Sequence, residues 1–123
     1  MRRELEETVK EISRLIRVND TKHRYTPPIM KNFESALYRI LYRNYKDRWF
    51  PEKPFKASGY RCIRVNKNYL DIRIAQAAEE AFGIEGPDIV HDILDFELTI
   101  WVDPLNCSIR IESFNIRNFY TCI

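Results

Sequence analysis

The sequence has few of the residues on which many enzymes and secreted domains depend. Its 123 residues include only two histidines, three cysteines and three glycines. An odd number of widely spaced cysteines gives no disulfide framework, so we expect a reducing compartment, the cytoplasm or the nucleus. No run approaches the ~18 apolar residues of a membrane-spanning helix. Acids interrupt the opening residues "MRRELEETVK", so we also expect no signal peptide.

Neither sign of charge is in clear excess. Twenty basic and eighteen acidic residues leave a net charge of +2, which gives little general attraction to nucleic acid or membranes. The chain has no C-x-x-C motif, no H-E-x-x-H motif and no glycine-rich phosphate loop, and His23 lies far from His91 in the sequence. A cysteine–histidine pair created by folding stays open. We therefore expect a non-enzymatic protein with no cofactor and no metal site.

The first half of the chain has the apolar period of two helices. Apolar residues recur at spacings of four, three and four from Leu5 to Ile16, which predicts an amphipathic helix. A second apolar face follows Pro27-Pro28, a typical helix start, and runs to about Tyr45. Because only a short polar loop joins them, the two helices should pack as an antiparallel pair.

The second half alternates short helices and strands. After the irregular stretch "RWFPEKPFKASGY", a strand is predicted from Tyr60, then a helix ending at Gly83 and another over 86–93. Three strands follow in succession, over about 97–103, 107–111 and from 116 onward. We therefore predict one α+β domain over residues 1–123, with a helix pair and two further short helices on a small, mainly antiparallel sheet.

The strand "ELTIWVD" places a tryptophan on its polar side. Leu98, Ile100 and Val102 share one face, and Glu97, Thr99, Trp101 and Asp103 share the other. Such an indole is either covered by another part of the same chain or offered to a partner, because tryptophan often dominates binding energy. Tyr60 lies opposite Ile63 and Val65 on the preceding strand. The candidate partner-binding residues are therefore Tyr60, Trp101 and Asp103.

Two other functions stay open at this point. Arg39, Arg43 and Lys46 recur at i, i+4 and i+7 beside tyrosines, a pattern that could hold RNA phosphates and stack bases. The same pattern is typical of a solvated helix face. An uncovered strand at the sheet edge could instead support weak self-association into a homo-oligomer.

Two long motifs resemble the BTG/Tob antiproliferative family. "RWFPEKPFKASGYRCIRVN", residues 48–66, is similar to its first signature box, and "LDFELTIWVDP", residues 94–104, to its second. The resemblance implies an adaptor that binds the DEDD-type nuclease subunit of the Not-type poly(A) deadenylase complex. Such an adaptor promotes mRNA deadenylation and translational repression and restrains proliferation, with mRNA engaged indirectly. Tyr60, Trp101 and Asp103 stand at the family's nuclease-contact positions.

The chain departs from the family pattern at two expected glycines. Ala57 stands where the first box usually has glycine, and "RIES", residues 110–113, replaces an R-I-G-E turn. We expect the fold to persist because other residues can build the turn, although the position of the last strand stays open. Trp49 and Pro51 are expected to be mainly structural.

Overall fold

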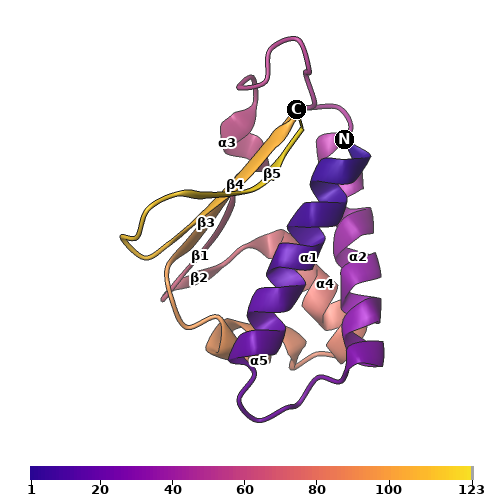
Figure 1. Ribbon diagram of the computed structural model, residues 1–123. Helices are drawn as coiled ribbons and strands as arrows, with labels where there is room; N and C mark the ends of the chain where they lie inside the picture. The colour runs from indigo at the N-terminus through magenta and orange to yellow at the C-terminus, as the bar shows by residue number, and fades with distance from the viewer. Residues whose placement is uncertain (123) are drawn as a thin grey trace.

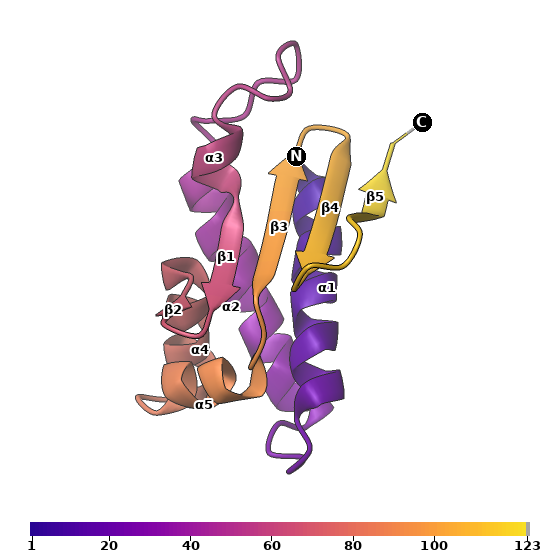
Figure 2. The same cartoon turned by 90° about the vertical axis from the view of Figure 1, so that its left-hand side faces the viewer.

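The protein is a layer of helices packed on one face of a five-stranded sheet. The computed structural model describes residues 1–122 (Figure 1). The long helices α1 (Arg2–Asn19) and α2 (Pro27–Tyr45) run side by side, and Figure 2 shows them behind the sheet. The shorter helices α4 (Ile72–Phe82) and α5 (Gly86–Ile93) lie near one end of this layer. The predicted antiparallel helix pair is confirmed.

The helix bounds follow from local sequence signals. Pro27 begins α2, where a missing backbone N–H costs nothing. The Asp71 carboxylate accepts a hydrogen bond from the backbone N–H of Arg73 and so caps the start of α4. Gly83 ends that helix with a φ of +90°, a conformation that side chains disfavour. The predicted bounds of α2 agree with the structure, and so do those of α5, which has Pro87 in its first turn.

Every neighbouring pair of strands in the sheet is antiparallel. The strand order is β2-β1-β3-β4-β5. The strands are β1 (Ile63–Asn66), β2 (Tyr69–Leu70), β3 (Leu98–Asp103), β4 (Asn106–Ile111) and β5 (Arg117–Thr121). The predicted α+β class is therefore confirmed, and β5 lies at one edge of the sheet beside β4.

The core fills the space between the helices and the inner face of the sheet. Leu5, Phe33, Leu37 and Ile74 are fully buried helix residues, and Ile100 meets them from β3. Removing such side chains from water is the main force that holds the two layers together.

The region around Tyr60 differs from the prediction. The first strand begins at Ile63 rather than at Tyr60, because residues Ser58–Arg61 form a single helical turn, α3. Ala57 precedes this turn with a φ of +62°, so the backbone bends sharply before the strand starts. The two-residue strand β2 was also not predicted; it pairs with β1 across a tight turn.

Candidate partner-binding surface

Trp101 lies on the sheet face that the helices leave uncovered. The buried residues of β3 on the helix side are Leu98, Ile100 and Val102, which confirms the predicted alternation. Thr99 and Trp101 point the other way and are half-buried. Ser108 of β4 stands opposite Trp101 in the register. The indole is therefore neither sealed inside the chain nor freely solvated.

The Asp103 carboxylate is largely buried, so its expected exposure to solvent is wrong, while its contact with a partner stays a prediction. Its side chain is only 9% exposed. The Oδ1 atom accepts hydrogen bonds from the Ser58 hydroxyl at 2.9 Å and from the Arg61 guanidinium at 3.0 Å. Strand parity places Asp103 on the outer face, but α3 covers that face at the end of β3.

Arg61 is a fully buried arginine that joins the two sequence boxes. Besides Asp103, its guanidinium donates to the backbone carbonyl of Val102 at 2.7 Å. It also donates to the carbonyls of Arg48, Pro54 and Lys56 at 2.6–2.9 Å. A buried cation is tolerated only when paired and fully hydrogen-bonded, and this one meets both conditions. Arg61 therefore holds the loop before α3 against the end of β3.

Tyr60 lies next to this arginine and is exposed. Its side chain is 45% accessible, and the guanidinium of Arg48 sits 4.1 Å from the centre of its ring. The Arg61 side chain donates a hydrogen bond to the carbonyl of Val102. Tyr60 directly precedes Arg61 in the chain and Trp101 directly precedes Val102, so both residues flank this contact at the same end of the sheet. The structure thus brings two of the three predicted residues to one surface region, with Asp103 beneath it.

A second buried arginine fixes the backbone of α3 from below. The Arg73 guanidinium donates to the carbonyls of Tyr60 at 3.0 Å and Cys62 at 2.8 Å. The Tyr45 hydroxyl donates to the carbonyl between them, that of Arg61, at 2.5 Å. Three consecutive carbonyls are therefore held by side chains. This arrangement fixes the backbone from which the Tyr60 ring projects before any partner arrives.

Tyr45 and Arg73, two members of this network, each keep one protonation state near neutral pH. Burial raises the pKa of the Tyr45 hydroxyl, so it remains a donor at neutral pH. Burial alone would lower the pKa of Arg73, but hydrogen bonds from its guanidinium to the Asp71 carboxylate outweigh that cost and raise the pKa. Tyr45 therefore stays neutral and Arg73 stays charged across the physiological range.

Sequence reasoning missed the supporting residues Ser58, Arg61 and Arg73. Arginine is among the residues least often found fully buried, so residue type alone gave no reason to place Arg61 or Arg73 in the interior. One signal was present for Arg61, because strand alternation places it on the same face as Ile63 and Val65. Trp49 was predicted to be structural; it is half-buried against the core, with the Arg61 guanidinium 5.2 Å from its ring centre.

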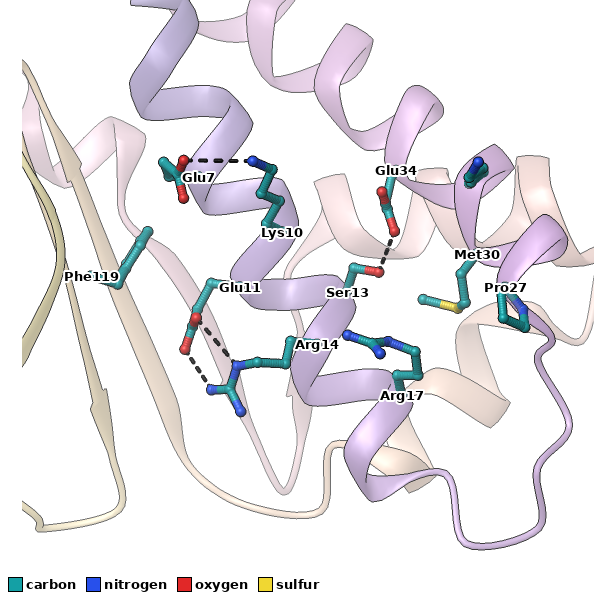
Figure 3. Close-up of a pocket in the computed structure, with 11 residues that line it drawn as sticks. Glu7, Lys10, Glu11, Ser13, Arg14, Arg17, Pro27, Met30, Glu34 and Phe119 are labelled. Atoms are coloured by element: carbon teal, nitrogen blue, oxygen red, sulfur yellow. Dashed lines mark hydrogen bonds and ion pairs between the residues drawn. The ribbon is translucent and has the colours of Figure 1, made fainter.

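A groove elsewhere on the molecule is lined by charged side chains, several of which are already paired. It has a volume of about 430 Å³ and runs along α1, between α2 and β5 (Figure 3). Figure 3 shows Arg14 bonded to Glu11 at 2.7 Å and the Ser13 hydroxyl bonded to Glu34 at the same distance. These groups satisfy one another, while the exposed Arg17 and Lys31 also line the groove.

The basic face of α2 is also partly neutralised. Arg39, Arg43 and Lys46 are exposed, as an RNA contact requires, but Arg39 forms an ion pair with Glu80 of α4. Within residues 1–122, no group of three or more potential metal ligands gathers. No helix in that range is long and apolar enough to cross a membrane. RNA binding through this face stays a prediction.

These features define a small α+β domain that carries a rigid aromatic surface at one end of its sheet. The BTG family model matches residues 1–121, so the chain belongs to the BTG family. Protein BTG2 from Homo sapiens is 48% identical over 82 residues, covering 67% of this chain and 50% of that protein. Protein BTG1 from Gallus gallus is 41% identical over 111 residues, covering 90% of this chain and 62% of that protein.

A solved structure shows the same fold. The BTG/Tob domain of FOG-3 from C. elegans matches with a TM-score of 0.81 and 22% identity, covering 99% of this chain and 91% of that chain. The chain spans between half and just under two thirds of the length of the two curated relatives.

Proposed function

We propose that this domain is an adaptor that binds the DEDD-type nuclease subunit of the Not-type poly(A) deadenylase complex. Binding would place the nuclease on selected mRNAs, in the cytoplasm and the nucleus, and so promote deadenylation and translational repression. An adaptor of this kind needs no chemistry of its own, because tethering raises the effective concentration of the catalyst at its substrate. The antiproliferative effect would follow from the shortened life of those mRNAs.

The observation that supports this proposal is the half-buried Trp101 on the uncovered sheet face, with Tyr60 exposed beside it. Aromatic side chains that are already fixed lose little conformational entropy on binding. The two buried arginines supply that rigidity from beneath. Asp103 contributes by orienting Arg61 and Ser58 rather than by presenting a free carboxylate.

Calorimetric titration of the nuclease with this domain tests the proposal. We expect saturable one-to-one binding of the wild-type domain. The Trp101→Ala variant should bind about thirtyfold more weakly, a loss of about 2 kcal/mol, as for a central aromatic anchor. A wild-type domain that gives no binding heat and no complex by sedimentation would exclude this function.

The two alternatives predict different results in the same preparations. Direct RNA binding through Arg39, Arg43 and Lys46 should appear as retention of poly(A) on a filter that falls steeply with added salt. Weak homo-oligomer formation through the edge strand β5 should appear as a sedimentation coefficient that rises with concentration.

A further inference from the structure

An exposed phenylalanine projects from the loop that Arg61 holds in place. Phe55 is 79% accessible, more than any other aromatic side chain in the described part of the protein. It lies in residues 46–57, the loop between α2 and α3, at the end of the sheet where β3 finishes (Figures 1 and 2). A single exposed apolar ring is common on protein surfaces, so what distinguishes Phe55 is its place beside α3 and the fixed backbone that carries it.

The backbone on both sides of Phe55 is fixed. The carbonyls of its neighbours Pro54 and Lys56 both accept hydrogen bonds from the buried Arg61 guanidinium, at 2.9 and 2.7 Å. Successive turns add bonds from Lys56 N–H to the Lys53 carbonyl and from Ser58 N–H to the Phe55 carbonyl itself. The interior of the molecule thus anchors the chain while the ring remains outside.

We propose that Phe55 is a further anchor residue of this surface and inserts into an apolar pocket of the nuclease subunit. The inference rests on the proposed function and extends its site beyond Tyr60 and Trp101. Four residues lie between Phe55 and Tyr60, so their Cα atoms are at most about 18 Å apart. One side of a standard interface covers about 800 Å², enough to include both.

The charges around Phe55 specify the chemistry of that pocket. Four basic and two acidic residues lie between positions 46 and 57, and Arg48, Lys53 and Lys56 are exposed. A pocket with an apolar floor and an acidic rim complements this arrangement. Attraction between the basic residues around Phe55 and the acidic rim of the pocket would mainly speed association. This attraction should weaken as salt is added.

A matched pair of substitutions tests the role of Phe55. Phe114 is 70% exposed, but it follows β4 at the opposite end of β3, because Ile111 of β4 pairs with Leu98. We expect Phe55→Ser to weaken nuclease binding by about fivefold or more, chiefly through faster dissociation, and Phe55→Leu to lose less. Phe114→Ser should stay within about twofold of wild type. Thermal melting checks that each variant is folded.

The outcomes separate the inference from the function on which it rests. Equal affinities of wild type and Phe55→Ser, in an assay where Trp101→Ala loses binding, would refute the anchor and leave the adaptor function intact. Equal losses in Phe55→Ser and Phe114→Ser would refute the anchor too, since both would then reflect general hydrophobic contact. A wild-type domain without nuclease binding would refute both.

Discussion

Ala57 and Glu112 adopt left-handed backbone conformations at positions where the family resemblance expects glycine. Their φ values are +62° and +54°. This conformation costs an L-residue roughly 1–2 kcal/mol, whereas glycine adopts it freely. Glu112 recovers part of the cost, because its N–H donates to the Glu97 carbonyl and its carboxylate accepts from the Glu97 N–H. Ala57 has no side-chain hydrogen bond with which to compensate, so its strain should be measurable.

Replacing Ala57 with glycine should stabilise the protein. We expect Ala57→Gly to raise the free energy of unfolding by about 0.5–1 kcal/mol, since relief of the left-handed strain exceeds the extra entropy of glycine in the unfolded chain. Urea unfolding provides the measurement. The control is Ala75→Gly within α4, which should lower the same free energy by about 1 kcal/mol. A destabilised Ala57→Gly protein would contradict the account of this turn.

Asp103 and Trp101 are neighbours in position but different in role. Asp103 neutralises a buried guanidinium, while Trp101 is half-buried on the uncovered face. Removing one partner of a buried ion pair typically costs about 3–5 kcal/mol, because the remaining charge is left without compensation. Loss of nuclease binding in an Asp103 variant would therefore report on folding as well as on contact.

The two substitutions should separate in stability measurements. We predict that Asp103→Ala lowers the free energy of unfolding by about 3 kcal/mol, at the lower end of that range because Arg61 keeps four backbone acceptors. Trp101→Ala should change it by less than about 1.5 kcal/mol. Denaturant titrations of wild type and the two variants, run side by side, test this prediction. Similar stability of Asp103→Ala and wild type would show that the Arg61–Asp103 ion pair does not stabilise the fold.

At the scale of elements, the sequence predicted what depends on local signals. Prolines mark the first turns of α2 and α5, and a glycine ends α4, so these elements were placed correctly. The alternation of β3 likewise predicted which of its residues are buried, up to Val102. A repeating pattern needs only neighbouring residues, and those are visible in one sequence.

The short helix α3 could not be predicted because remote contacts decide it. "GYRCIRV" alternates like a strand, yet Tyr45 and Arg73 bind the carbonyls of residues 60–62. Arg61 then turns inward to acceptors from residues 48–56 and from β3. The same contacts cover Asp103 and expose Tyr60. Two of the three candidate residues were therefore placed on the surface correctly, and the third was not.

At the scale of the whole molecule, two acids of α1 tie the helical layer to the sheet. The Glu4 carboxylate accepts a hydrogen bond from the Leu105 N–H at 2.9 Å, in the turn between β3 and β4. Glu11 forms ion pairs with Arg14 and with Arg117 of β5. Burial alone would raise the pKa of both carboxyl groups, but these hydrogen bonds and charges outweigh it and lower the pKa.

These shifts predict a loss of stability in acid. A carboxyl group with a lowered pKa in the folded state binds protons more readily in the unfolded state. The stability that such a group contributes is therefore present at a pH above its ordinary pKa of 4.5 and is lost as the pH falls below that value. We expect the free energy of unfolding, measured in urea between pH 7 and pH 3, to decline over the lower part of this range. Glu11→Gln should decline less steeply. An identical slope in both proteins would contradict the assigned role of Glu11.

The measurement that tests the central claim most directly is the affinity of the deadenylase nuclease for a set of four proteins. These are wild type, Trp101→Ala, Tyr60→Ala and the control Tyr69→Ala. Tyr60 and Tyr69 are 45% and 46% exposed, so they differ in place and not in accessibility. Tyr69 lies on β2, paired with Asn66 at the end of β1 away from α3.

The account predicts tight binding by wild type and by Tyr69→Ala, with clear losses for Trp101→Ala and Tyr60→Ala at unchanged fold. Affinities that are equal in all four proteins would contradict it, because the rigid aromatic surface at the end of β3 would then not be where the nuclease binds.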